Sequence, residues 1–242
     1  MTAKISIAMP FHLRGMPYNK SYEIAIRYYS LLGYPLHLCG SEGELSKKFC
    51  KPFLSKRTKY FEVPQISVCQ KSKGDEVIRK KFNDSLSTLP NSDWYCLVGA
   101  DDLASRSFFT ELGNINVSTP VMAGINMKEP IYMIDLTRKA NNIWRISIDY
   151  GQRMDLLPGV NAFSSQVMLE SNGNMYNEEG CETGAERWMR KNGTVLPLKG
   201  SVILLKGDTV LNSVNAILGR HKSLHMTNDE IETIRSIVGY YK

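Results

Sequence analysis

Residues 94–102 read WYCLVGADD, a short continuous apolar run with an acidic pair directly behind it. An apolar run without alternation is typical of a strand buried on both faces, as in the centre of a parallel sheet. In open α/β sheets, ligands bind outside the carboxyl ends of such strands. The stretch therefore predicts a central strand that ends at a ligand site, where it presents Asp101 and Asp102.

The sequence before this stretch predicts a strand, a helix and a second strand. Residues 4–9 form a buried apolar run that stops at Pro10, and residues 34–39 form a second one. Between them, apolar residues recur at the spacing of one helix face. These residues are Tyr22, Ala25, Ile26, Tyr29 and Leu32. The resulting βαβ unit favours an α/β fold.

The rest of the chain predicts a mixture of short strands and helices. We expect strands at residues 59–63, 119–126, 131–137, 143–149 and 202–205, and helices at 75–89, 163–170, 181–192 and 208–218. Thr227 and Glu230 form a capping box for a last helix. Consecutive short strands favour an antiparallel addition to the parallel sheet. Without repeats or a convincing linker, one domain over residues 1–242 is the economical interpretation.

Composition narrows the class of protein. The chain has 242 residues with 43% hydrophobic content, which is enough for a buried core. Its 30 Lys and Arg residues outnumber 24 Asp and Glu residues, and a net charge of +6 suits anionic substrates or nucleic acid as well as a solvated surface. Five cysteines without a Cys-x-x-Cys pair favour a reducing compartment. No apolar run is long enough for a membrane span or a signal peptide. We therefore expect a cytoplasmic protein, in the host cytoplasm if the chain is viral.

The acidic pair itself suggests a metal site. Adjacent carboxylates are hard oxygen ligands, which suit Mg²⁺ or Mn²⁺ bridging a diphosphate. Such an ion neutralises the charge that builds on a phosphate leaving group. The alternative is a loop in which Asp101 and Asp102 only form a turn and cap a helix ahead of Arg106.

The order of these motifs resembles that of nucleotide-sugar glycosyltransferases of the GT-A fold. The matching stretches are residues 5–10, 36–42, 74–83 and 97–102. The resemblance implies a single GT-A-like α/β domain with a Rossmann-like mixed central sheet flanked by helices. Residues 1–102 would form its nucleotide-binding half and residues 103–242 its acceptor-side half. The large inverting family that this chain resembles usually has Asp-x-Asp-Asp in the last stretch, and here Gly99 replaces the first acid.

The resemblance also implies a set of donor-binding residues. They are Pro10, Phe11, His12 and Arg14 beside the nucleobase, Ser41 and Glu42 after the second strand, Arg79, Lys80, Lys81 and Asn83 near the diphosphate, and Ala100 with Asp101. Aromatic side chains stack on bases and cations pair with phosphates. The alternatives are a core position for Phe11, a turn at Ser41 and Glu42, and a solvated helix face for the Arg-Lys-Lys run.

Residues 176–193 resemble the segment that holds the family's catalytic base. Counted back from Gly193, the base falls on Glu182, and Cys181 replaces the acid before it. Glu182 would take the proton of the acceptor hydroxyl. Alternatively, it is only a first-turn acid that favours the helix dipole. His225, or His221, is a candidate third metal ligand beside Asp101 and Asp102, although isolated histidines are more often structural or exposed.

These observations favour a metal-dependent, inverting glycosyltransferase with a UDP-sugar donor and Mn²⁺ or Mg²⁺ as cofactor. Its acceptor would be an intracellular hydroxyl, and the basic charge permits a hydroxymethylated base in viral DNA, flipped out of the duplex. A nucleotidyltransferase is one alternative, although residues 8–15 have a single glycine where those enzymes have a glycine-rich loop. A non-catalytic nucleotide-sugar-binding module is another, because Gly99 and Cys181 depart from the motif.

Overall fold

The computed structural model describes residues 2–13, 18–63, 71–136, 142–147, 154–176, 182–206, 217–218 and 222–241. Arg14, Cys181, His221 and most of the helix expected at 208–218 lie outside these residues. Within the described part of the chain, no helix has both the length and the apolar character that crossing a membrane requires.

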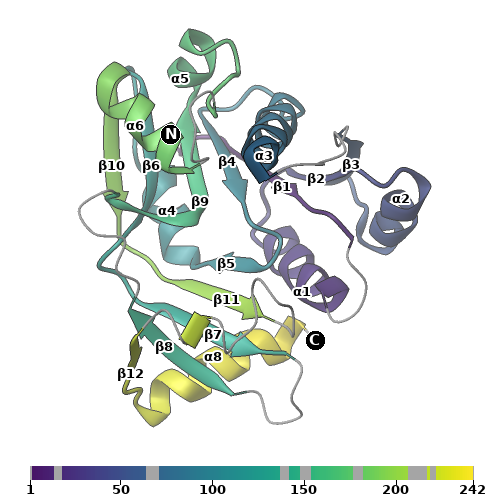
Figure 1. The fold of residues 1–242 in the computed structure, drawn as a ribbon, viewed down its shortest axis with the longest axis vertical. Helices are drawn as coiled ribbons and strands as arrows, with labels where there is room; N and C mark the ends of the chain where they lie inside the picture. The colour runs from purple at the N-terminus through teal and green to yellow at the C-terminus, as the bar shows by residue number, and fades with distance from the viewer. Residues whose placement is uncertain are drawn as a thin grey trace.

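A seven-stranded mixed sheet forms the centre of the molecule (Figure 1). Its strands, in spatial order, are β10 (Thr194–Leu198), β6 (Val121–Asn126), β9 (Leu156–Ser164), β4 (Trp94–Val98), β1 (Ile5–Pro10), β2 (Leu36–Gly40) and β3 (Thr58–Glu62). Strand β1 runs parallel to β2 and β4, whereas β9 runs antiparallel to β4 and β6. The apolar run at 94–98 is therefore a central strand, and the expected α/β fold with a mixed central sheet is confirmed.

A second sheet of five strands lies beside the first (Figure 1). Its order is β12 (Lys222–Leu224), β8 (Ile143–Ser147), β7 (Ile131–Asp135), β11 (Val202–Lys206) and β5 (Asp102–Ala104). The strands expected at 131–137 and 143–149 thus pair in this sheet rather than extend the central one. The chain passes from the first sheet to the second between β4 and β5, so Asp101 and Asp102 stand at the junction of the two sheets.

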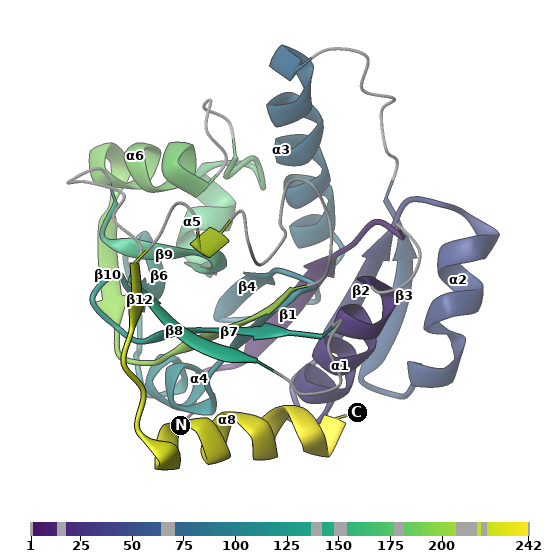
Figure 2. The ribbon, with the colours of Figure 1, turned by 60° about the horizontal axis from the view of Figure 1, so that its bottom comes forward.

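Helices cover both faces of the central sheet (Figure 2). The described helices are α1 (Tyr18–Ser30), α2 (Glu44–Cys50), α3 (Lys71–Ser87), α4 (Arg106–Gly113), α5 (Ser165–Glu170), α6 (Glu182–Asn192) and α8 (Asn228–Tyr241), with a short 3₁₀ helix η1 (Lys51–Phe53) after α2. Helix α8 packs against α1 rather than on the central sheet. The larger apolar core includes residues of α1, α4 and α8 and of both sheets. A smaller core lies under α3, α5 and α6. One continuous apolar cluster therefore joins the two sheets.

Residues 163–170 and 44–50 also differ from the elements expected for them. The helix expected at 163–170 begins only at Ser165, because Phe163 is paired as a strand residue with both Tyr95 and Met122. Residues 44–50 form helix α2, for which the sequence predicted no regular element. Its buried residues are Ser46 and Cys50, one turn apart, so the inward face carries too little apolar character to be recognised.

Candidate functional site

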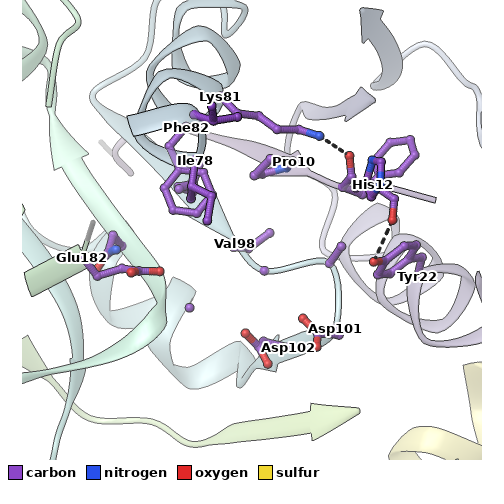
Figure 3. A pocket seen from close by; sticks show the side chains of 17 residues that line it. Pro10, His12, Tyr22, Ile78, Lys81, Phe82, Val98, Asp101, Asp102 and Glu182 are labelled. Carbon is purple, nitrogen blue, oxygen red and sulfur yellow. Dashed lines mark hydrogen bonds between the residues drawn. The ribbon is translucent and has the colours of Figure 1, made fainter. Parts of the chain in front are cut away.

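A pocket of about 330 Å³ opens at the carboxyl ends of β1 and β4, between α1 and α3 (Figure 3). Eight of the expected site residues line it: Pro10, Phe11, His12, Lys81, Ala100, Asp101, Asp102 and Glu182. The edge of the sheet explains this grouping, because β1 and β4 are adjacent parallel strands whose ends meet at one place. The pocket combines an aromatic end with an acidic end.

The aromatic end is fixed by hydrogen bonds to the loop after β1. The Tyr22 hydroxyl donates to the His12 carbonyl oxygen at 3.1 Å, and the Lys81 ammonium donates to the Phe11 carbonyl oxygen (Figure 3). Phe11 is 3% exposed and packs against Tyr22, with ring centroids 6.1 Å apart. Phe11 is thus a core residue and a pocket residue at the same time.

Ser41 and Glu42 support this end from outside the pocket lining. His12 Nδ1 pairs with Glu42, and the Ser41 hydroxyl donates to Glu42 Oε1 at 2.8 Å. Lys81 Nζ lies 3.0 Å from Ser41 Oγ. Burial would raise the pKa of Glu42, but hydrogen bonds from Ser46 and Ser41 and the nearby His12 lower it overall. These two residues orient His12 and Lys81 rather than line the pocket.

The residues of α3 that were expected near the diphosphate line two separate pockets. Val77, Ile78, Lys81 and Phe82 line the pocket just described. Arg79, Lys80 and Asn83 instead line a separate polar pocket of about 550 Å³, together with residues 172–174. Residues three and four apart share a helix face, so Lys81 and its neighbour Lys80 necessarily point to different places.

The contacts of the second group are structural. Lys80 Nζ pairs with Asp84 Oδ2 at 2.8 Å. Asn83 Oδ1 accepts a hydrogen bond from the Tyr176 amide at 2.9 Å, and Asn83 Nδ2 donates to the Tyr176 carbonyl oxygen at 3.3 Å. Asn83 thereby holds residue 176 to α3, and the structure does not bring it to the aspartates.

The glycine at position 99 makes room for an aspartate. A Cβ atom on Gly99 or on Gly159 would stand less than 3.0 Å from Asp102 Oδ2. The Gly99 amide donates to the Gly159 carbonyl oxygen at 2.8 Å, so the two glycines close around the carboxylate. Gly159 has a φ of 90°, which L side chains rarely adopt. The departure from the acidic motif at Gly99 therefore has a steric reason.

Two tyrosines of α1 hold the backbone behind the acidic pair. The Tyr29 hydroxyl donates to the Asp102 carbonyl oxygen at 2.8 Å and accepts from the Ala104 amide at 3.0 Å. The Tyr28 hydroxyl donates to the Ala104 carbonyl oxygen at 2.6 Å. The sequence pattern correctly placed Tyr29 on the inward face of a helix, but it gave no sign that its hydroxyl anchors β5.

A lysine that the sequence analysis missed contacts both aspartates. Lys206, the last residue of β11, has its Nζ 2.6 Å from Asp101 Oδ2 and 3.6 Å from Asp102 Oδ1. Burial would lower the pKa of Lys206, but the two carboxylates raise it. The only sequence signal is a lysine at the end of the apolar run VILLK at 202–206.

Asp102 is held in an unfavourable environment for a charged group. Burial, opposed by Lys206 and reinforced by Asp101 and Glu182, raises the pKa of Asp102 to about 7. Its Oδ1 atom is buried without a hydrogen-bond partner among the described residues.

Glu182 stands where two pockets meet. It is the first residue of α6 and lines the 330 Å³ pocket on the side facing the aspartates (Figure 3). It also lines a second pocket of about 220 Å³, which shares Asp102 and Gly159 with the first. The other residues of the second pocket are Ile131, Leu157, Pro158, Val202, Leu204 and Lys206. Burial raises the pKa of Glu182, which suits a proton acceptor that works near neutral pH.

The described residues do not fit a divalent metal ion. Among them, no group of three or more His, Cys, Asp or Glu side chains is placed to hold one. His225 is exposed and follows β12, at the opposite edge of the five-stranded sheet from the β5 strand that carries Asp102. The structure thus does not bring the expected third ligand to the aspartates, and the Lys206 ammonium lies against them instead.

The sequence matches no protein-family model and no curated protein sequence. Several solved structures are similar in fold. Glycosyltransferase GlyE of Streptococcus pneumoniae is 11% identical with a TM-score of 0.46, over 80% of this chain and 45% of that chain. The inositol-1-phosphate CTP transferase of T. maritima is 12% identical with a TM-score of 0.46, over 98% of each chain. Glucosyl-3-phosphoglycerate synthase of Mycobacterium tuberculosis, solved with Mn²⁺ and UDP, is 12% identical with a TM-score of 0.45, over 98% of this chain and 80% of that chain. At TM-scores below 0.5, these similarities concern the fold alone.

Proposed function

We propose that this protein is a glycosyltransferase that uses a nucleoside-diphosphate sugar, with a UDP-sugar as the first donor to test. The observation that carries the proposal is the position of Glu182, which lines both a larger pocket with an aromatic end and a smaller adjoining pocket. Glycosyl transfer needs a donor pocket and an acceptor pocket that adjoin. The proton acceptor must reach the acceptor hydroxyl at the place where its oxygen bonds to the donor sugar.

In this proposal the donor lies in the larger pocket. The nucleoside occupies the end formed by Phe11 and His12, and the diphosphate lies toward Asp101 and Asp102. The sugar then reaches Glu182. Residues 1–102 supply most of this donor site, whereas residues 103–242 supply Glu182 and most of the smaller acceptor pocket.

The reaction we propose is a single displacement with inversion. The acceptor hydroxyl oxygen bonds to the anomeric carbon while Glu182 takes the hydroxyl proton. The bond from that carbon to the diphosphate oxygen breaks, and its electron pair leaves with the nucleoside diphosphate. No step is assigned to Mn²⁺ or Mg²⁺, because Lys206 lies against both carboxylates that would hold the ion.

Sugar-nucleotide turnover tests the proposal directly. The protein is incubated with UDP-glucose, UDP-galactose or UDP-N-acetylglucosamine, and released UDP is measured for the wild type and for Glu182→Gln. Release by the wild type that falls in the variant supports glycosyl transfer. Pyrophosphate release from CTP and a sugar phosphate would indicate a nucleotidyltransferase instead. Nucleotide binding without either release would indicate a binding module.

A hydroxymethylated DNA base is the specific acceptor we propose to test, supported by the net charge of +6. Binding of a hydroxymethylcytosine-containing duplex should weaken steeply as salt rises, because cationic side chains release counterions from phosphates. No binding even at low salt would contradict a DNA acceptor while leaving the donor assignment intact.

A further inference from the structure

The place expected for a divalent cation holds a positive charge that belongs to the chain itself. Lys206 Nζ lies 2.6 Å from Asp101 Oδ2 and 3.6 Å from Asp102 Oδ1. The residue is only 8% exposed, so its ammonium group is a fixed part of the site rather than a solvated surface charge.

The two strands that carry these residues fix this arrangement. Strand β11 runs antiparallel to β5, with Leu204 opposite Asp102. The Leu205 amide donates to the Asp101 carbonyl oxygen at 2.7 Å. The backbone of Lys206 is therefore held beside the acidic pair by the pairing of β11 with the adjacent strand β5.

The surroundings of Asp102 leave its carboxylate little freedom to coordinate a metal ion. Its Oδ2 atom is enclosed by Gly99 and Gly159, and its buried Oδ1 atom faces the ammonium group. A magnesium ion requires oxygen ligands at about 2.0–2.1 Å in nearly octahedral geometry. An ion bridging the two aspartates would have to displace Lys206 Nζ and would then repel it at close range.

We propose that Lys206 takes the place of a divalent cation at the aspartate pair, so that nucleotide binding needs no added metal ion. The ammonium neutralises one carboxylate and lowers the repulsion that the two partly buried carboxylates exert on an incoming diphosphate. Lys206 acts through the aspartates and is a positioning residue.

The first test measures metal binding and does not depend on the proposed function. Mn²⁺ is titrated into the wild type and into Lys206→Met, Lys206→Arg and the exposed control Lys199→Met, with bound Mn²⁺ measured by electron paramagnetic resonance. We expect a Mn²⁺ site only in Lys206→Met, lost again when Asp101→Asn is added. Mn²⁺ should also raise the melting temperature of Lys206→Met alone, because a ligand of the native state stabilises it. A wild-type Mn²⁺ site that Asp101→Asn removes would overturn the inference, even if Lys206→Met does not fold.

The second test rests on the proposed function and measures UDP affinity with either EDTA or Mn²⁺ present. The wild type should bind UDP with the same Kd, within about twofold, in both conditions. Lys206→Met should bind UDP at least about tenfold more weakly in EDTA, a change that corresponds to the loss of one modest interaction. Added Mn²⁺ should restore the affinity of this variant for UDP. UDP binding by the wild type only with Mn²⁺ overturns the role of Lys206. No binding of UDP, GDP, CDP or ADP in either condition overturns the proposed function, while the Mn²⁺ titration still decides whether Lys206 closes the metal site.

Discussion

Gly99 and Asp102 share one small space: a side chain on the first would overlap the carboxylate of the second, because a Cβ there would stand less than 3.0 Å from Asp102 Oδ2. The chain thus uses glycine where an acid is usual in the family that it resembles. The absent side chain allows Asp102 to turn back against the strand end, where Gly159 closes over it. The lost acid and the buried aspartate are two consequences of one packing arrangement.

Gly99→Asp should therefore damage the site rather than restore a motif. The new side chain forces Asp102 out of its place, and overpacking of this kind costs about 1–3 kcal/mol. We expect a lower melting temperature and weaker UDP binding. Gly239→Ala is the control, because nothing lies within 4 Å of a Cβ in that position of α8. The control should be neutral or slightly stabilising, and a Gly99→Asp variant with wild-type stability would contradict the packing described here.

Replacement of the proposed base should separate chemistry from binding. Glu182→Gln keeps the size of the side chain but cannot accept the hydroxyl proton, so kcat should fall by about 10²–10⁴-fold with UDP affinity unchanged. Glu186 provides a matched control one turn further along α6. It is 1% exposed and accepts hydrogen bonds from the Asp155 amide at 2.8 Å and from Arg190 at 2.7 Å. Glu186→Gln should lower stability and leave kcat of the folded protein near that of the wild type.

The pH dependence of turnover should reflect the raised pKa of Glu182. A base must be ionised to act, so kcat/KM should fall as the pH drops through this pKa, with a midpoint above the ordinary value of 4.5. Stability changes in the opposite sense, because a folded-state pKa above the unfolded value contributes stability at low pH that is lost as the pH rises through it. Glu182→Gln should thus lose less stability than the wild type between pH 4 and pH 7. A wild-type kcat/KM profile that is flat down to pH 4.5 would exclude this residue as the base.

Individual strands and helix ends could be predicted because the sequence patterns that indicate them are local. The apolar run at 94–98 is the central strand, and the capping box of α8 forms as expected, with the Glu230 amide donating to Thr227 Oγ1 at 3.2 Å. The second sheet was not predictable, because short strands look alike whichever sheet they join. The pairing of a strand such as β7 depends on tertiary contacts, and a short stretch of sequence does not reveal these contacts.

The site residues that could be predicted from the sequence are those that directly follow a strand, because the strand determines where they lie. Asp101 and Asp102 follow β4, and this alone places them at the sheet edge. Lys206 was missed because it is 105 residues from Asp101 in the sequence and meets it only through the pairing of β5 and β11. A lysine that ends an apolar strand has no distinctive sequence pattern, so its role depends entirely on the partner strand.

Neighbouring lysines on α3 should respond differently to the same substitution. Of the described residues that line the 330 Å³ pocket, Lys81 is the only lysine or arginine, whereas Lys80 lies on the other face, paired with Asp84. Lys81→Met should weaken UDP binding by about tenfold, because the Lys81 ammonium holds the Phe11 carbonyl oxygen at the end of the pocket where the nucleoside lies. It should also lower stability through the loss of the bonds to the Phe11 carbonyl oxygen and Ser41. Lys80→Met should leave UDP affinity within about twofold, since exposed ion pairs contribute little. Calorimetric titration of both variants with UDP measures the difference, and equal losses in the two would mean that the nucleotide lies along the outer face of α3 rather than in the pocket beside the aspartates.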